Sequence, residues 1–325
     1  MDNLIDIIID KFGLDIESVV KDRSCYIIKT DDGSFIAKKS VSPKEHILFQ
    51  HKVKEFLCED GFCNIDRFVL TREENPLPFF SRGDELITVS KLYPFREADF
   101  TYLPDALKVS ETLGLLHRTT EKYDFVQAGR FFSHDIAAEY EKGIAFLQSI
   151  KKTLTAGKNI SDFDITVAKN YDFYLKRAEE AVKLLSELYR GRSVICHNLV
   201  KEENFLLNDE EIYITEFSKI SAASPVFDLS QLIGRIIKSS AKNEEAGIIS
   251  VKQLINSYVK FGDFDENDAK KLYASLIYPK SFIKSCMNFY NKKRTFVPVS
   301  VKNKLDQIIE VKQLEQSCIE QILSL

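Results

Sequence analysis

The sequence predicts an α+β protein of two lobes, a small β-rich lobe followed by a large helical lobe. Alternating β-prone runs with turn residues are concentrated in the first ninety or so residues, and amphipathic helical patterns dominate the rest. One short β-rich island, residues 204–215, interrupts the helical part. We therefore expect an N-terminal β-rich lobe with one helix over residues 1–95 and a C-terminal helical lobe over residues 96–325.

The elements of the small lobe follow from turn signals and periodicity. Residues 25–39, CYIIKTDDGSFIAKK, predict a hairpin, since two alternating runs flank an Asp-Gly turn. Residues 43–60 carry apolar side chains at helical spacing, and Gly61 marks the end of that helix. Residues 64–71 and 85–95 predict two further strands.

The large lobe is predicted from three long amphipathic patterns. Residues 104–123 begin with a proline at a helix start, residues 134–154 follow, and residues 164–191 place apolar side chains along one stripe and end at Gly191. Residues 204–215 then predict a hairpin around the NDEE turn, and helices dominate the remainder.

Composition and charge exclude several classes of function. The chain has 325 residues, of which 44% are hydrophobic and 29% charged, as in ordinary globular proteins. Its net charge of −4 gives no overall attraction to nucleic acid. No stretch is long enough to span a bilayer, and the acidic N-terminus is unlike a signal peptide. We therefore expect no nucleic-acid partner, no membrane insertion and synthesis in the cytoplasm.

The cysteines are scattered along the chain, with no Cys-x-x-Cys pair and no paired histidine spacing. This usage favours reduced thiols over a disulfide framework or a zinc site. The six positions are 25, 58, 63, 196, 286 and 318.

The order of elements is typical of protein kinases and of small-molecule kinases of the aminoglycoside-phosphotransferase type. In such an architecture a nucleotide lies between the lobes. We therefore expect the connector near Ser90–Tyr93, that is Ser90, Lys91, Leu92 and Tyr93, to offer backbone groups to an adenine. ATP and Mg²⁺ are the cofactors that this reading allows.

Lys38, in the run FIAKKS, fits the strand lysine that neutralises nucleotide phosphates in kinases. The alternative is a surface lysine on an exposed strand. The sequence does not choose its helix partner among Glu45, Gln50 and Glu55.

His197 and Asn204 have the spacing of a kinase catalytic loop, in which His-x-Asp is followed by Asn five residues after the Asp. Glu216, in Thr-Glu-Phe, falls where the metal-binding Asp would stand, so Asn204 and Glu216 are the candidate metal ligands. The base position, however, is Leu199. An aliphatic side chain accepts no proton, and a general base contributes roughly 10²–10⁴-fold in rate.

Two further residues point to a loop kept for its structure. Asp228 begins a predicted helix, where its carboxylate can accept backbone N–H groups from the 197–204 loop. His197 is favoured as a buried histidine that ties the loop to neighbouring backbone, because Leu199 removes its catalytic context. Glu216 keeps a charge but adds a methylene, which displaces a metal that requires strict octahedral geometry.

The C-terminal segment 275–309 resembles that of spore coat proteins of the CotS family. The likeness extends to DDGSFIAKK, EFLCEDGFCNIDRF, KLYPFREADF and ETLGLLHRTT, and so to nearly the whole chain. The matching C-terminal residues are Pro279, Phe282, Lys284, Asn288, Tyr290, Asn291 and Lys293.

The resemblance implies a kinase-like fold related to aminoglycoside and choline kinases, production during sporulation, deposition in the spore coat and other coat proteins as partners. The family's loop reads His-Gly-Asp with Asn five residues later, then Ile-Asp-Phe. This chain keeps His197, Asn204 and Phe217 but has neither aspartate.

Three functions remain open at this point: an inactive pseudokinase with a structural or assembly role, which we favour, a pseudokinase that binds nucleotide, and an active phosphotransferase. The run FYNKKR adds a possible contact. We expect Phe289 and Tyr290 to pack a helix against the cleft wall, with residues 292–294 as either a solvated helix end or a patch for an acidic coat partner.

Overall fold

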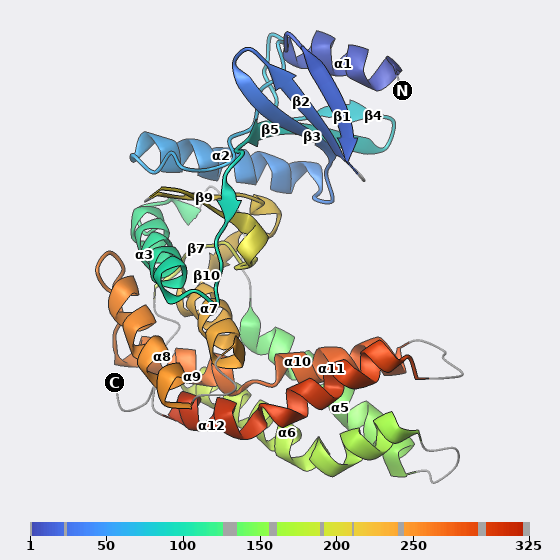
Figure 1. The fold of residues 1–325 in the computed structure, drawn as a ribbon, viewed down its shortest axis with the longest axis vertical. Coiled ribbons are helices and arrows are strands. Elements are labelled where there is room, and N and C mark those ends of the chain that lie inside the picture. The colour runs from blue at the N-terminus through green and yellow to red at the C-terminus, as the bar shows by residue number, and fades with distance from the viewer. Residues whose placement is uncertain are drawn as a thin grey trace.

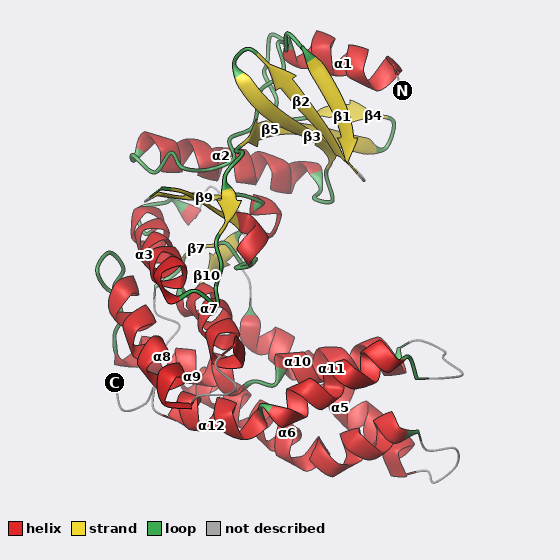
Figure 2. Ribbon diagram, in the orientation of Figure 1, coloured by secondary structure: helices red, strands yellow, loops and turns green. Residues whose placement is uncertain are grey.

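The computed structural model describes residues 2–22, 25–125, 135–155, 161–188, 192–209, 211–239, 244–291 and 297–320. Figure 1 shows the N-terminal sheet at one end of an elongated molecule and the long helices at the other, with helix α2 between them. Figure 2 shows the same division by secondary structure, since the largest sheet lies in the N-terminal lobe and helices dominate the other lobe. The predicted bilobal α+β fold is confirmed.

The N-terminal lobe is a five-stranded antiparallel sheet with the strand order β1-β2-β3-β5-β4. The predicted hairpin 25–39 is confirmed, because Thr30 pairs with Gly33 across its turn. Helix α1 packs Ile8 and Phe12 into an apolar cluster with the sheet. The bounds are α1 (Asp2–Phe12), β1 (Ser18–Asp22), β2 (Cys25–Thr30), β3 (Gly33–Lys39), β4 (Phe80–Arg82) and β5 (Glu85–Leu92).

The predicted helix over residues 43–60 is confirmed as α2 (Lys44–Glu59). The predicted strand over residues 64–71 is wrong. That segment makes only isolated bridges, from Ile65 to Ile214 and from Phe68 to Ser90. It crosses from one sheet to another, so no single strand can form along it.

A small sheet lies between the main sheet and the helical lobe. It joins β6 (Arg96–Glu97), β8 (Phe205–Asn208) and β9 (Glu211–Ile214) in the order β6-β8-β9. The predicted hairpin within residues 204–215 is thus confirmed. Next to it, β7 (Val194–Cys196) pairs with β10 (Ser221–Ala223), and two short 3₁₀ helices, η2 (Glu202–Asn204) and η3 (Phe217–Lys219), follow β7 and β9.

Helices form the rest of the C-terminal lobe around one large apolar core. The capping box of Ser161 and Asp164 begins the long helix α6, which buries Val167 and Tyr171 as its stripe predicts. Gly191 lies outside the described residues. The helices are α3 (Leu103–Thr120), α5 (Ile136–Thr155), α6 (Asp162–Glu187), α7 (Val226–Ser239), α8 (Glu244–Tyr258), α9 (Glu266–Ile277), α10 (Lys280–Tyr290), α11 (Val299–Glu310) and α12 (Lys312–Glu320).

Helices α3 and α8 cross closely at Gly114. A Cβ atom on this glycine would lie 2.4 Å from the carbonyl oxygen of Tyr258. The two helices can approach this far only because the residue has no side chain. Within the described ranges, no helix is both long and apolar enough to cross a membrane.

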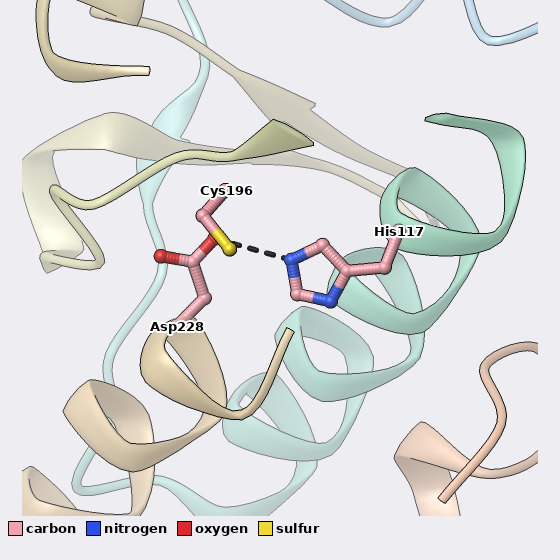
Figure 3. Close-up of side chains that lie close together, drawn as sticks. All are labelled: His117, Cys196 and Asp228. Atoms are coloured by element: carbon pink, nitrogen blue, oxygen red, sulfur yellow. Dashed lines mark hydrogen bonds and ion pairs between the residues drawn. The ribbon is translucent and has the colours of Figure 1, made fainter. Parts of the chain in front are cut away.

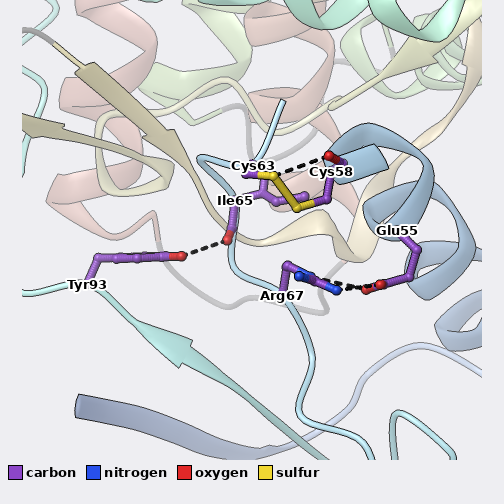
Figure 4. Close-up of a disulfide and its surroundings, with 6 residues drawn as sticks. All are labelled: Glu55, Cys58, Cys63, Ile65, Arg67 and Tyr93. Atoms are coloured by element: carbon purple, nitrogen blue, oxygen red, sulfur yellow. Dashed lines mark hydrogen bonds and ion pairs between the residues drawn. A yellow bond between two sulfur atoms is a disulfide. The ribbon is translucent and has the colours of Figure 1, made fainter. Parts of the chain in front are cut away.

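The expectation of reduced thiols is wrong for two cysteines. Cys58 and Cys63 form a disulfide across the turn that ends α2 (Figure 4). Gly61 has a φ of 89°, and the resulting turn brings the two Cα atoms to 4.4 Å, within the range of a disulfide. Cys25, Cys196 and Cys286 form no disulfide in the described part of the chain.

Candidate functional site

Asp228 holds the loop that follows β7. Its two carboxylate oxygens accept the backbone N–H groups of His197, at 2.5 Å, and Asn198, at 2.7 Å. The residue lies in the first turn of α7 and is fully buried. The structure therefore places Asp228 against the loop backbone as the sequence predicts.

His197 is buried among aromatic rings. Its Nε2 atom lies 2.8 Å from the carbonyl oxygen of Thr215, and its ring packs edge to face on Phe205 and Phe217. Burial lowers the pKa of His197 in spite of the nearby Asp228 carboxylate, so the ring is neutral near pH 7. These contacts join the loop to the end of β9.

His117, on α3, completes the buried cluster around Asp228 (Figure 3). Its Nε2 atom lies 3.2 Å from Asp228 Oδ2, and its Nδ1 atom lies 2.9 Å from the hydroxyl of Tyr258. Sequence analysis gave His117 no role, although it lies in the GLLHRTT run. Its partners are more than 100 residues away, and no local pattern signals them.

Together with Cys196, these residues could be read as a metal site, because ligand atoms of His117, Cys196 and Asp228 lie within 4.8 Å of one another. The chemistry does not fit. Burial raises the pKa of the Cys196 thiol, whereas a metal ligand must be a thiolate. Both nitrogens of His117 and both oxygens of Asp228 already have protein partners. The cluster is a hydrogen-bonded support for the loop.

The loop keeps its shape although its chemistry differs. Asn198 has a φ of 62°, in the left-handed region that a glycine adopts easily and Asn tolerates. Its side-chain amide donates to the carbonyl of Lys219 and the hydroxyl of Ser221, both at 2.9 Å. Asn204 donates through Nδ2 to the carbonyl oxygen of Leu199, at 2.9 Å. At position 199 the polar contact is therefore made by the backbone carbonyl and not by the side chain.

Lys38 and Glu216 meet in a direct ion pair, 2.5 Å from Nζ to Oε2. Each side chain is about one third exposed, at 32%. Burial alone lowers the pKa of Lys38, but the Glu216 carboxylate outweighs it and the net shift is upward. Burial likewise raises the pKa of Glu216, and Lys38 reverses this to a net decrease. Both groups are charged at neutral pH.

Glu216 also has a left-handed backbone, with φ 65° and ψ 60°. A non-glycine residue in this region costs about 1–2 kcal/mol, and such residues concentrate at functional sites. Its N–H donates to Asp66 Oδ2, at 3.1 Å, which helps to fix the turn.

None of the three candidate helix partners pairs with Lys38. Glu55 binds Arg67, at 2.5 Å, and Gln50 bonds to His46. Glu45 makes no ion pair with Lys38 within the described part of the chain, where the ion-pair partner of Lys38 is Glu216.

Helix α2 contributes a buried lysine near the site, and not an acidic partner for Lys38. Lys54 lies 2.7 Å from Asp66 Oδ1 and 3.9 Å above the ring of Phe68. It is 1% exposed, and burial lowers its pKa against the opposing effect of Asp66. Lys38, Lys54, Asp66 and Glu216 therefore form two linked ion pairs, which we call the cleft pairs.

The two candidate metal ligands differ in how far they are free to hold a magnesium ion. Mg²⁺ prefers carboxylate oxygens, water and substrate phosphates in an octahedron. Glu216 Oε2 is held by the Lys38 ammonium at 2.5 Å, whereas the hydrogen bond of Asn204 to the loop uses Nδ2 and not its oxygen. An ion would therefore compete with Lys38 for the Glu216 carboxylate.

The expected connector is partly wrong. Ser90, Lys91 and Leu92 lie in β5, paired with residues of β3. On the other side, Ser90 bridges to Phe68 and the N–H of Lys91 donates to the carbonyl of Arg67. These backbone groups are used within the sheet, because the 64–71 segment covers this edge. The connector thus begins at Tyr93.

Tyr93 is anchored beside the connector. Its hydroxyl donates to the carbonyl of Ile65, at 3.0 Å (Figure 4), and its ring packs on Phe95 and Tyr213. The aromatic cluster of Tyr93, Phe95 and Tyr213 joins the connector to β9.

The aromatic pair of the FYNKKR run packs away from the cleft. Phe289 stacks on Phe163 at 4.2 Å, and the hydroxyl of Tyr290 donates to Asp164, at 2.7 Å. Both contacts are to the start of α6, so the expected packing against the cleft wall is wrong. Residues 292–296 lie outside the described residues.

Comparison with solved structures defines the class. An aminoglycoside phosphotransferase from Alicyclobacillus acidocaldarius subsp. acidocaldarius DSM 446 matches with a TM-score of 0.83, at 17% identity over 98% of this chain and 95% of that one. Spectinomycin phosphotransferase APH(9)-Ia matches at 0.69, with 15% identity and 98% of both chains covered. Choline kinase LicA from Streptococcus pneumoniae matches at 0.56, with 14% identity, 96% of this chain and 99% of that one. The fold is that of the aminoglycoside phosphotransferases.

A family model narrows the class to one group. The model described as spore coat putative kinase YutH matches residues 5–322, nearly the whole chain. The chain belongs to this family of spore coat putative kinases, and the predicted spore-coat resemblance is confirmed. No curated protein matches the sequence.

Proposed function

We propose that this chain is a catalytically inactive pseudokinase with a structural or assembly role in the spore coat. The observation that carries the proposal is Leu199 at the position of the general base. No proton acceptor replaces it there, since the contact with Asn204 uses only the Leu199 carbonyl. Without a base, transfer to a hydroxyl loses roughly 10²–10⁴-fold in rate.

The cleft pairs support the same proposal. In a kinase the strand lysine binds nucleotide phosphates and the acid binds magnesium. Here Lys38 and Glu216 neutralise each other. Nucleotide phosphates and a metal would each have to compete with this ion pair.

The family supports the proposed place and partners. Membership among spore coat putative kinases supports synthesis in the mother cell, deposition in the coat and contacts with other coat proteins. The names of the structural neighbours give no reason to transfer their substrates. Aminoglycosides and choline are cations, whereas the charged side chains that line a cavity in the described helical lobe are mostly basic.

A second candidate is a pseudokinase that binds nucleotide as a folding or assembly ligand. The observation that favours it is that Lys38 and Glu216 are in contact between the lobes. Asn204 lies at the end of the 197–204 loop and bonds to Leu199. An active ATP-dependent phosphotransferase is a third candidate, which would need Asn204 and Glu216 to share a metal.

Titration of the purified chain with ATP, with and without Mg²⁺, separates these candidates when heat release and phosphate turnover are both measured. We expect no turnover above background. Absence of binding would also eliminate the nucleotide-binding pseudokinase. Turnover that is well above background and is abolished by Glu216→Ala would overturn the proposal.

The double variant Leu199→Asp with Glu216→Asp sharpens the test, because it restores the base and shortens the metal acid. We expect nucleotide hydrolysis to appear in this variant and not in Glu216→Asp alone. If hydrolysis stays at background, more of the site than these two positions has been lost.

A further inference from the structure

The helical lobe contains a cavity of about 390 Å³ beside the 197–204 loop. This volume is within the range of small-molecule sites. Its walls come from α5, α6, α7, α9, α10, α11 and α12, and from the loop at Asn198 and Lys201. The cleft pairs do not contribute to it.

The charged side chains around this cavity are strongly unequal in sign. Two are acidic, Glu139 and Glu315. Six are basic, namely Arg177, Lys201, Arg235, Lys238, Lys280 and Lys284.

Three of the basic groups are balanced by carboxylates. Arg235 binds Glu202 at 2.6 Å, and Lys201 binds Glu203 at 3.3 Å. Lys280 lies 3.8 Å from Glu139. These pairs leave Arg177, Lys238 and Lys284 as the remaining cations of the wall, and Glu315 as its remaining acid.

Those three cations come from three helices, α6, α7 and α10, and converge on one space. Among the described residues, no carboxylate lies within 4.0 Å of any of them, and the ammonium of Lys238 donates to the hydroxyl of Ser281 at 2.8 Å. A guanidinium and two ammonium groups supply the donors that carboxylates and phosphates accept.

The uncharged part of the wall includes two stacked aromatic pairs. Tyr140 stacks on Tyr278 with ring centroids 3.5 Å apart, and Tyr174 stacks on Phe282 at 4.1 Å. A wall of this kind packs against the uncharged body of a ligand, while the cations hold its charged groups.

We propose that this cavity binds a small organic polyanion, a molecule that carries two or more carboxylate or phosphate groups. The proposal goes beyond the structural role and does not depend on it, because no residue of the cleft pairs takes part. Arg177, Lys238 and Lys284 bind the anionic groups. The negative charge of Glu315 repels them and lowers the affinity.

The test is a calorimetric titration of the full chain, without nucleotide or Mg²⁺, with inorganic pyrophosphate and with citrate as probes. Spermidine serves as the cationic probe. We expect saturable binding of at least one anion at one site and none of spermidine. The stronger of the two anions identifies the phosphate or the carboxylate class.

Two variants locate the site. Lys238→Gln with Lys284→Gln removes two exposed ammonium groups of the wall and should weaken anion binding about tenfold or more, given the strength of close charge pairs. Lys21→Gln with Lys252→Gln makes the same change in net charge at two exposed positions that do not line the cavity and should leave affinity unchanged. Glu315→Gln should strengthen binding, because it removes the opposing charge.

Several results would overturn the proposal: no binding of either anion, equal weakening in both double variants, or tighter binding of spermidine than of the anions. Loss of binding in Lys38→Gln with full binding in Lys238→Gln/Lys284→Gln would place the anion in the cleft and also overturn it. ATP titration is a separate measurement, so failure of this proposal and failure of the proposed function are distinguishable.

Discussion

At the residue scale, Asp228 and Leu199 show how one loop separates structure from chemistry. Asp228 accepts two backbone N–H groups and contacts His117, all within a buried environment. Leu199 contributes its carbonyl to Asn204 and an aliphatic side chain to the base position. The hydrogen bonds that define the loop are therefore independent of the group that would abstract a proton.

Asp228→Asn should lower the free energy of unfolding by about 2–3 kcal/mol, because charged hydrogen bonds contribute about 1.5–3 kcal/mol each and the amide keeps one acceptor oxygen. Urea denaturation measures this. Asp306→Asn, at an exposed position of α11, removes the same charge and should change stability by less than about 0.5 kcal/mol. Equal effects of the two variants would contradict the role given to Asp228.

At the element scale, the crossing of α3 and α8 positions the buried cluster. Gly114 allows the close approach, and Tyr258 at the end of α8 reaches the His117 ring of α3. His117 in turn contacts Asp228 at the start of α7. Three helices are thus coupled to the loop through consecutive side-chain contacts.

Gly114→Ala should destabilise the protein by about 1–3 kcal/mol, because the added methyl group meets the Tyr258 carbonyl and forces the helices apart. Gly234→Ala is the matched control, since its Cβ atom would lie 3.8 Å from a Leu276 methyl group. In an open helical position the same change should stabilise, by up to about 1 kcal/mol. Thermal unfolding of the two variants should therefore shift in opposite directions.

At the scale of the whole molecule, one buried and two half-buried histidines make stability depend on pH. Burial lowers the pKa of His46, His51 and His197 below the ordinary value of 6.5. Between the folded and the ordinary pKa the unfolded chain binds protons that the folded chain does not. The free energy of unfolding therefore rises with pH through this window and falls as pH drops below about 6.5.

Each histidine should change the free energy of unfolding by at most about 1.4 kcal/mol per pH unit. Burial raises the pKa of Glu315 and Asp268, which act in the opposite sense at lower pH. The free energy of unfolding should be measured for the wild type and for His51→Gln at pH 7.5, 6.5 and 5.5. The difference between the two isolates the contribution of His51, because both proteins contain the same acids. We expect a smaller slope in the variant; an unchanged slope would contradict the effect of burying His51.

Local patterns predicted most of the architecture and the position of Asp228. The hairpin 25–39, the helix 43–60 and the hairpin within 204–215 each depend on periodicity and turn residues close in sequence. The cleft pairs could not be predicted in the same way. Lys38 and Glu216 are 178 residues apart, and the contacts of His117 exceed 100 residues. The strand expected over residues 64–71 failed for a related reason, because its partners belong to two different sheets.

The Lys38–Glu216 ion pair joins β3 of the sheet lobe to the segment that leads into η3 of the helical lobe. His46 on α2 reaches the same segment through the carbonyl of Ile220, at 3.1 Å, and Ser42 contacts that of Ser218. A kinase needs freedom between its lobes to admit and release nucleotides. Here these contacts between protein groups join the sheet lobe and α2 to the segment around η3.

That restraint has a consequence for assembly. A protein that joins a layer loses conformational freedom, and the loss opposes association. Lobes that are already fixed against each other have less freedom to lose, so each contact with a neighbour contributes more of its free energy to cohesion. Under the proposed coat role, the Lys38–Glu216 ion pair would thus favour a rigid and durable assembly.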